Sequence, residues 1–278
     1  MTMTAILEDT AAVLAPVRQH PSPDDRPPAH ITVRGLYKQF QGSVIYENFD
    51  IDIPRGKFVS IFGPNGCGKS TLINLISGLI PLDSGEVLFD GKTLAETRIG
   101  YVFQNYREAL FPWMTAFDNI AYALKLRGVP KAEAHEKVRK LVAHLGVKID
   151  LTIYPYMMSG GQQQLVSIMR ALIVDPEVLF LDEPFSALDY EMTLFMREQL
   201  QRIFEETGTT MVLVSHDLEE AVYLADYVLL LTRRPGNIAA YPKVEITRPR
   251  NDATLANPDF VTLKSNCLEI FQREVRRS

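Results

Sequence analysis

Features that would point to secretion or to a membrane span are missing from this chain. Cysteine occurs at only 2 of 278 positions, Cys67 and Cys267, which lie far apart and lack metal-site spacing. That usage argues against a disulfide framework and fits a reducing compartment. The longest apolar stretches, such as Val228–Leu231, are much shorter than the roughly 20 residues that cross a bilayer.

The charge balance argues against a nucleic-acid-binding protein. Charged residues make up 23% of the chain and the formal net charge is -5, so we expect no strong attraction to nucleic acid. The N-terminal region does not resemble a signal peptide, because Asp9, Asp24, Asp25 and several prolines interrupt any apolar core. We therefore expect a cytosolic chain, or one bound to a membrane only through a partner.

Apolar residues make up 46% of the sequence, enough for a sizeable core in one large domain or two small ones. Residues 1–29 stand apart, because prolines lie there among Ala, Asp and Arg without any period. We predict that this segment is a disordered tail and that the folded part begins near residue 30.

The chain is organised around residues 57–79, which read as a buried strand, a glycine-rich turn and a helix that begins at Thr71. The turn fits the phosphate-loop pattern G-x-x-x-x-G-K-[ST], and the flanking strand and helix argue against a chance match. In such a loop, backbone N–H groups surround the oxygens of a di- or triphosphate. Lys69 supplies a charge for the β/γ-phosphates, and the Ser70 hydroxyl can ligate Mg²⁺. The predicted nucleotide contacts are Gly63, Pro64, Asn65, Gly66, Cys67, Gly68, Lys69, Ser70 and Thr71.

Strands and helices alternate through the rest of the chain. A helical insert covers about 105–158, and its amphipathic helix Lys131–Leu145 stops at Gly146. This alternation predicts an α/β fold with a parallel sheet, helices on both faces and ligands at the carboxyl ends of the strands. The strand-like runs outside the phosphate-loop unit are 31–37, 48–53, Glu86–Phe89, Ile99–Phe103, Val178–Asp182, Thr210–Ser215 and, last, Tyr227–Leu231.

Polar groups at the ends of these strands should converge on one edge of the sheet, because Gly63, Asp182 and His216 each adjoin a predicted strand end. Asp182 is the carboxylate that a Mg²⁺ ion on the phosphate loop requires. Glu183 could orient or deprotonate a water that attacks the γ-phosphate, or the acidic pair could be a solvated turn that caps the next helix. His216 could bond the γ-phosphate or be structural, and Phe40 could be ordinary core.

Six motifs occur in one order: GPNGCGKST, Gln104 after a strand, SGGQQQ, VLFLDEP, SALD and SHD. With these separations the chain resembles the ATP-binding subunit of an ABC transporter over roughly residues 31–245. The resemblance implies an α/β P-loop NTPase fold of the ABC cassette type. Such a cassette has a parallel core sheet, an antiparallel β subdomain and a helical subdomain, here about 105–170. The resemblance assigns 30–245 to the ATP-binding domain and 246–278 to a C-terminal extension with at most a helix near Val261–Val275.

The resemblance also implies a catalytic and metal set. Glu183 takes the place of the catalytic base, and His216 matches the switch histidine of the family. Gln104 matches the glutamine that senses the metal and the γ-phosphate. The metal ligands would be Ser70, Gln104 and Asp182.

Further nucleotide contacts follow from the same resemblance. Phe40 matches the aromatic residue that stacks on adenine, and Asp189 matches the D-loop aspartate. The signature segment, in the family, binds the γ-phosphate of ATP held by the other subunit of a head-to-tail dimer. A Ser hydroxyl and N–H groups at a helix start are suited to an anion. The signature residues here are Ser159, Gly160, Gly161 and Gln162.

Two stretches, FPWMTAFDNI and LTRRPGNI, are similar to ATPases of the nitrate, sulfonate, taurine and bicarbonate importer group. In the family, the segment after the glutamine loop receives helices of the membrane subunit. Trp113 is therefore a candidate docking anchor, with a core aromatic as the alternative. Arg233 and Arg234 would otherwise be read as a solvated turn. Leu165 departs from the family, which usually has arginine there.

We therefore expect an ATPase that binds ATP and Mg²⁺ between two cassettes and drives uptake of a small solute, such as one of these anions, through a separate permease. Its partners would be a second cassette, the permease and an extracytoplasmic solute-binding protein. Its location would be the cytoplasmic face of the bacterial inner membrane. The alternative, a soluble ABC-type ATPase outside transport, is disfavoured because the chain has one cassette and no heptad run. A P-loop kinase or GTPase would leave SGGQ and SALD unexplained.

Overall fold

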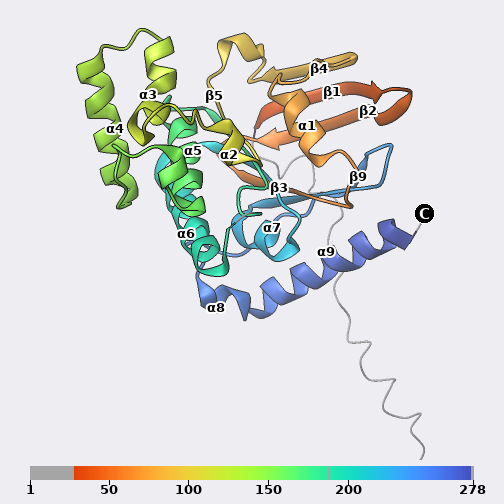
Figure 1. Cartoon of the computed structure of the whole chain (residues 1–278). Helices are drawn as coiled ribbons and strands as arrows, with labels where there is room; N and C mark the ends of the chain where they lie inside the picture. The colour runs from red at the N-terminus through yellow and green to blue at the C-terminus, as the bar shows by residue number, and fades with distance from the viewer. Residues whose placement is uncertain (1–27, 187, 277–278) are drawn as a thin grey trace, which may run out of the picture.

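A computed structural model describes residues 28–186 and 188–276 of the chain (Figure 1). Most of the predicted N-terminal tail, residues 1–27, lies outside the described residues, and the first strand already begins at Ala29. Two sheets form the centre of the fold. None of the helices in the described ranges is both long and apolar enough to cross a membrane.

The smaller sheet is antiparallel and has the strand order β2-β1-β4. Buried and more exposed residues alternate over parts of β1 and β2, as one-sided packing requires. In β2, for example, Phe49, Ile51 and Ile53 are buried, whereas Asp50 is exposed. The strands are longer than the sequence runs suggested: β1 is Ala29–Phe40, β2 is Ser43–Pro54 and β4 is Ser84–Phe89.

The larger sheet has the strand order β5-β6-β7-β3-β8-β9, and all neighbours pair in parallel except β8 and β9. The prediction that Tyr227–Leu231 is the last strand is wrong, because β9 follows it as a three-residue edge strand. So short a strand carries too little periodicity to be recognised from sequence. The bounds are β3 Phe58–Phe62, β5 Ile99–Val102, β6 Val178–Asp182, β7 Thr210–Val214, β8 Tyr227–Leu231 and β9 Ile238–Ala240.

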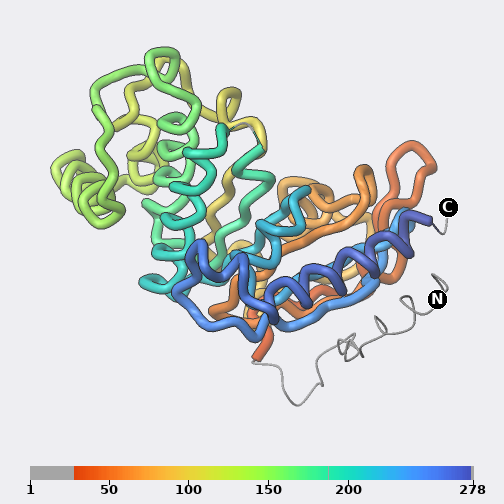
Figure 2. The backbone as a smooth tube through the Cα atoms, turned by 90° about the horizontal axis from the view of Figure 1, so that it is seen from below, coloured from red at the N-terminus to blue at the C-terminus, as the bar shows by residue number. Residues whose placement is uncertain are grey.

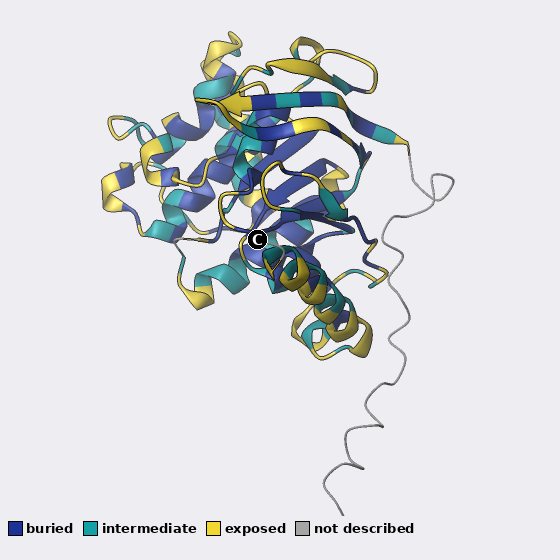
Figure 3. Ribbon diagram, turned by 90° about the vertical axis from the view of Figure 1, so that its right-hand side faces the viewer, coloured by how far each residue is buried: buried dark blue, intermediate teal, exposed yellow. Residues whose placement is uncertain are grey.

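Alternate residues of the central strands enter two different hydrophobic cores. In β6, Leu179 and Leu181 belong to one core, while Val178 and Phe180 belong to the other. Helix α1 (Lys69–Ile76) packs into the second core beside the antiparallel sheet, and α6 (Tyr190–Thr207) and α7 (Leu218–Leu224) pack into the first. The predicted sheet with helices on both faces is thus confirmed, and Figure 3 shows these strands as the buried centre of the molecule.

A group of helices stands at one end of the molecule, away from the antiparallel sheet (Figure 1). Gly146 ends α4 at the predicted position, where φ of +61° favours a glycine. The helices are α2 Tyr106–Ala109, α3 Ala116–Leu126, α4 Lys131–Leu145 and α5 Gly160–Leu172, with the 3₁₀ turn η3 at Pro155–Met157. Another 3₁₀ turn, η2, spans Leu94–Glu96 between the two sheets in sequence.

The C-terminal segment forms α8 (Asp252–Leu255) and a longer helix, α9 (Pro258–Arg276), which confirms the predicted helix there. Figure 2 shows α9 running beneath the core sheet. Phe260 and Cys267 are its buried residues, and both belong to the core that also holds α7. The helix is therefore part of the domain surface, with one face packed and the other exposed.

Candidate functional site

The phosphate loop joins β3 to α1, and its shape depends on glycine. Gly68 has φ of +115°, and a Cβ atom there would lie 2.8 Å from Cγ2 of Ile45 and 3.0 Å from the Tyr46 hydroxyl oxygen. Only a residue without a side chain fits so close an approach. The helix begins at Lys69, two residues before the predicted start at Thr71. The backbone N–H groups of the loop therefore lie at a helix start, as an anion site requires.

Lys69 lies across this loop. Its Nζ donates hydrogen bonds to the carbonyl oxygens of Gly63, at 2.9 Å, and Pro64, at 3.2 Å, and the side chain is buried. The ammonium group is therefore held inside the loop, where its charge can act on a phosphate in a poorly screened environment.

Asp182, at the end of β6, faces the first turn of α1. Its Oδ1 accepts a hydrogen bond of 2.8 Å from Oγ of Ser70, and its Oδ2 lies 3.5 Å from the hydroxyl of Tyr101. Burial raises the pKa of the Asp182 carboxyl, the hydrogen bond from Ser70 opposes that rise, and the charge of Glu183 adds to it. A carboxylate and a hydroxyl side by side are oxygen donors of the kind that Mg²⁺ prefers, so the donor set fits this ion. Within the described residues, no group of three His, Cys, Asp or Glu forms a separate metal site.

Two residues of the hydrogen-bond network around Asp182 were not predicted from the sequence. Tyr101 lies in β5, and its hydroxyl donates to Oδ1 of Asn74 at 2.6 Å. Asn74 is four residues after Ser70 on α1, a spacing that places both on one face of the helix and could have been noticed. The sequence around Tyr101 gives no such signal, because the pairing of β5 with β6 brings Tyr101 close to Asp182.

Glu183 lies at the centre of a second cluster. Its Oε2 accepts a hydrogen bond of 2.8 Å from Nε2 of Gln104 and lies 3.3 Å from Nδ1 of His216. The three residues follow β5, β6 and β7, adjacent strands of the sheet. Glu183 has φ of +43°, a conformation that is uncommon outside glycine. As predicted, polar side chains that follow adjacent strands meet at one edge of the sheet.

The signature segment begins α5. Ser159 caps the helix: its Oγ accepts from the N–H of Gln162 at 3.3 Å, and its own N–H donates to Oε1 of Gln162 at 3.0 Å. A Cβ on Gly160 would lie 2.8 Å from the Tyr106 hydroxyl. In the described part of the chain, no hydrogen bond joins this segment to the phosphate loop of the same molecule.

The helix behind the signature is nevertheless tied to the site. Gln164 is fully buried, and its Nε2 donates to the carbonyl oxygen of Pro184 at 2.7 Å. Sequence reasoning did not single out Gln164. Leu165, at the position where arginine is usual in the family, is buried in the core. The missing charge is thus replaced by an apolar packing contact.

The remaining predicted residues lie on the surface. Phe40 ends β1 with 42% of its surface exposed, so it is not a core residue, and Nζ of Lys38 lies 5.1 Å from its ring centroid. Asp189 caps α6 by accepting a hydrogen bond of 2.8 Å from the N–H of Met192. Neither contacts the Glu183 cluster through any hydrogen bond among the described residues.

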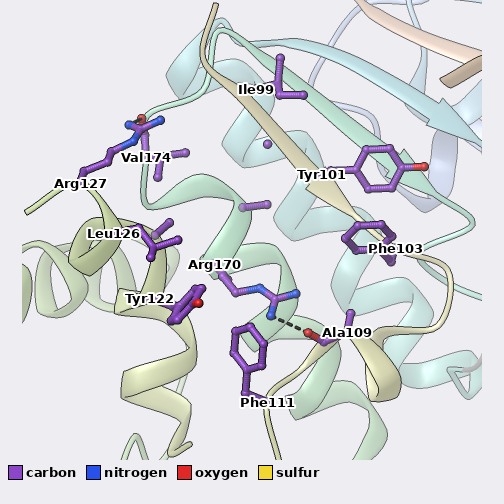
Figure 4. A pocket seen from close by; sticks show the side chains of 13 residues that line it. Ile99, Tyr101, Phe103, Ala109, Phe111, Tyr122, Leu126, Arg127, Arg170 and Val174 are labelled. Carbon is purple, nitrogen blue, oxygen red and sulfur yellow. Dashed lines mark hydrogen bonds between the residues drawn. The ribbon is translucent and has the colours of Figure 1, made fainter. Parts of the chain in front are cut away.

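Trp113 is 70% exposed, so the core alternative for it is wrong. Its ring lies 5.5 Å from that of Phe111, which lines a cavity of about 460 Å³ between β5 and the helices α3 and α5 (Figure 4). Arg170 stands in this cavity, where its Nη1 donates to the carbonyl oxygen of Ala109 at 2.7 Å. The lining is otherwise mostly apolar.

Comparison with known proteins agrees with this geometry. A family model for the ABC transporter matches residues 46–186. An uncharacterized ABC transporter ATP-binding protein of Methanocaldococcus jannaschii is 36% identical over 260 residues, which cover 91% of this chain and 96% of that protein. The aliphatic sulfonates import ATP-binding protein SsuB of Bacillus subtilis is 37% identical over 245 residues, covering 87% of this chain and 93% of that protein.

Solved structures agree as well. A bacterial ABC transporter cassette determined as a dimer superposes with a TM-score of 0.68 and 29% sequence identity, covering 78% of this chain and 100% of that chain. The fold is thus that of an ABC cassette, with a parallel core sheet, an antiparallel β sheet and a helical part. The chain belongs to the ABC transporter family, as an ATP-binding subunit that hydrolyses ATP.

Proposed function

We propose that this chain energises the uptake of a small anion, such as a sulfonate, taurine, nitrate or bicarbonate, through a separate permease. The observation that carries the catalytic part is the Glu183 carboxylate, which accepts from Gln104 and faces His216 beside the phosphate loop. The solute class rests on the similarity to the sulfonate importer ATPase and on the FPWMTAFDNI and LTRRPGNI stretches.

In this proposal Glu183 is the base that takes a proton from the attacking water, and His216 bonds the γ-phosphate. Mg²⁺ would be held by Ser70 and Asp182, with Gln104 as a further ligand that responds to the γ-phosphate. The ion would supply charge neutralisation and Lewis-acid polarisation of the phosphoryl oxygens. Proton removal by a placed carboxylate is the kind of step that general-base catalysis accelerates.

Nucleotide binding would use surfaces from two cassettes. The exposed ring of Phe40 is available to stack on adenine, since 42% of its surface is free. The capped start of α5 at Ser159, with Gly160, Gly161 and Gln162, would bind the γ-phosphate of ATP on a second cassette, and Asp189 would lie at the same interface. A partner cassette is also supported by the dimeric structure that this chain resembles.

The membrane partner would dock on the face that carries Trp113. The Trp113 ring lies 5.5 Å from that of Phe111, and Phe111 lines the cavity of Figure 4 together with Tyr122 and Leu126. An exposed tryptophan near an apolar cavity fits a helix of a permease. The chain would thereby lie at the cytoplasmic face of the bacterial inner membrane. An extracytoplasmic solute-binding protein would deliver the anion to the permease.

Two measurements test the proposal. The variant Glu183→Gln should lose at least about 100-fold in ATPase rate, the lower range for general-base catalysis, and keep its affinity for ATP. The matched control is Glu133→Gln, because Glu133 lies on the surface of α4 and, among the described residues, forms an ion pair only with Lys137. Full ATPase activity in Glu183→Gln would exclude Glu183 as the base.

The transport part is tested by purifying the tagged chain from detergent-solubilised membranes of its host. Copurification of a polytopic permease and a solute-binding protein is expected, and binding assays with that protein against small anions would name the solute. Recovery of the chain without a membrane partner would favour a soluble ABC-type ATPase outside transport.

A further inference from the structure

A second cavity, of about 800 Å³, lies beside the start of the phosphate loop. It is lined by loop residues 63–67 and His216, by two arginines of the turn after β8, and by the last turns of α9. Ser70, Asp182 and Glu183 do not line it, but His216, which faces Glu183, does. The cavity therefore shares residues 63–67 and His216 with the nucleotide site, and it adds Phe62, the two arginines and the end of α9, which that site lacks.

The polar wall of this cavity carries two positive charges without partners. Arg233 and Arg234 are exposed, and neither guanidinium forms a hydrogen bond, ion pair or ring contact within the part of the chain that the structure describes. By contrast, Arg248 is paired with Asp226 at 3.1 Å. Two adjacent, unpaired guanidinium groups attract an anion and can bind its oxygens in a bidentate fashion.

The turn that carries these arginines is held in place. The hydroxyl of Thr232 donates to the carbonyl oxygen of Arg233 at 3.0 Å and accepts from the N–H of Asn237 at 2.9 Å. The N–H of Gly236 donates to the carbonyl oxygen of Ile45 at 2.7 Å, which ties the turn to β2. A turn fixed at both ends presents its charges without a large ordering cost on binding.

Arg234 also acts on the loop beside it. Burial raises the pKa of the Cys67 thiol, and the charges of Lys69 and Arg234 oppose that rise. The Arg234 charge is thus close enough to influence a buried group of the phosphate loop.

The opposite wall is apolar. The rings of Phe62 and Phe271 lie 5.0 Å apart, and Val275 adds a methyl-bearing surface one turn further along α9. Phe62 immediately precedes Gly63, so the C-terminal helix packs directly behind the phosphate loop. A ligand that fits both walls needs an anionic head and a short apolar body.

From this arrangement we propose that the cavity is a second ligand site, which adjoins the nucleotide site along the phosphate loop and binds a small organic carboxylate or sulfonate beside the nucleotide. The anionic group lies against Arg233 and Arg234, and the apolar body lies against Phe62, Phe271 and Val275. The site does not depend on which solute the permease transports.

The test uses the full-length chain saturated with Mg²⁺ and a non-hydrolysable ATP analogue, and 1-hexanesulfonate as the probe in isothermal titration calorimetry. Binding of one probe per chain is expected. Replacing both guanidinium groups, in Arg233→Gln/Arg234→Gln, should weaken it about tenfold or more, the equivalent of losing one charge-assisted contact. The control Arg139→Gln, on the exposed face of α4, should leave the affinity unchanged.

Two further probes separate the two walls. Sodium sulfate lacks the apolar body and 1-hexanol lacks the charge, so both should bind more weakly than 1-hexanesulfonate. Phe271→Ala should weaken 1-hexanesulfonate binding and leave sulfate binding unchanged, with circular dichroism checking that the variant is folded.

Several results would overturn the proposal. They are binding that disappears when the nucleotide analogue is present, equal affinity in the double arginine variant, or equal affinity for sulfate. A loss of nucleotide affinity in the double variant would instead assign the arginines to ATP. None of these readouts depends on hydrolysis or transport, so failure here is distinct from failure of the proposed function.

Discussion

The Oγ atom of Ser70 donates a hydrogen bond to Oδ1 of Asp182 across 2.8 Å. This contact joins the first turn of α1 to the end of β6, two elements more than 100 positions apart in sequence. It places the hydroxyl and the carboxylate that would share a Mg²⁺ ion in contact before any ion binds. Because the Asp182 carboxyl is buried, its charge affects the free energy of unfolding.

Asp182→Asn should stabilise the protein at neutral pH when nucleotide and Mg²⁺ are absent. The folded pKa of Asp182 lies above its ordinary value of 3.8, chiefly because of burial. The folded state therefore binds the proton more tightly, and the free energy of unfolding falls as pH rises from the ordinary value through the folded pKa. Removing the charge should raise the free energy of unfolding by about 1 kcal/mol at pH 7.

Urea unfolding at several pH values checks this. The advantage of Asp182→Asn should shrink as pH falls through the folded pKa of Asp182, and it should vanish well below pH 3.8, where the wild-type carboxyl is protonated in both states. A variant that is less stable than wild type at pH 7 would mean that the hydrogen bonds of the carboxylate outweigh its desolvation.

The same substitution should remove the dependence of ATP binding on Mg²⁺. An amide is a weaker ligand than a carboxylate for this hard cation, and the substitution also removes the negative charge at position 182. Titration of ATP with and without Mg²⁺ measures the effect, and Tyr101→Phe serves as the control, because it removes only the hydroxyl 3.5 Å from Oδ2. An unchanged Mg²⁺ effect in Asp182→Asn would remove this residue from the metal site.

His216→Ala should lower the ATPase rate by at least about 100-fold, the lower range for losing one donor that stabilises charge in the transition state. ATP affinity should change little, because the phosphate loop and Lys69 remain. Steady-state kinetics and nucleotide titration separate the two. The control is His144→Ala, whose Nε2 lies 2.6 Å from Oε2 of Glu206, far from the site in the helical part. A fully active His216→Ala would leave Glu183 and Gln104 as the working pair.

Gly68→Ala should destabilise the fold as well as abolish nucleotide binding. The added Cβ meets Ile45 at 2.8 Å, and φ of +115° is unfavourable for alanine. Backbone strain and overpacking each cost of the order of 1–3 kcal/mol, so a loss of about 3 kcal/mol is expected. Chemical denaturation measures it. Gly91→Ala isolates the backbone term, because φ there is +75° and no atom lies within 4 Å. Equal losses in the two variants would contradict the packing argument.

Trp113→Ala should leave the isolated chain unaffected and disrupt its assembly. With 70% of its surface exposed, the side chain contributes little to the core, so the free energy of unfolding should change by no more than about 0.5 kcal/mol. Copurification of a membrane partner should be lost. Leu268→Ala is the control, as Leu268 is also exposed, at 43%, on α9. A membrane partner retained by Trp113→Ala would place the docking surface elsewhere.

Local patterns in the sequence predicted what depends on neighbouring residues. The helix Lys131–Leu145 and the strands Val178–Asp182 and Tyr227–Leu231 have the predicted bounds. Their apolar periodicity, and the glycine after the helix, act within a few residues. The same holds for the phosphate loop, whose glycines, Lys69 and Ser70 form one continuous segment. The family could be recognised from such segments in order.

Tertiary structure decided which distant segments meet. Strand order and helix packing decide that Tyr101 approaches Asp182 and that Trp113 is exposed. They also decide that Arg233 and Arg234 face the end of α9. These contacts join residues far apart in the chain, so no local propensity encodes them. The three-residue strand β9 was missed for a related reason, because it is stabilised by pairing with β8 and has no periodicity of its own. The sequence by itself determined the chemistry available at this site, and the sheet topology decided which groups share it.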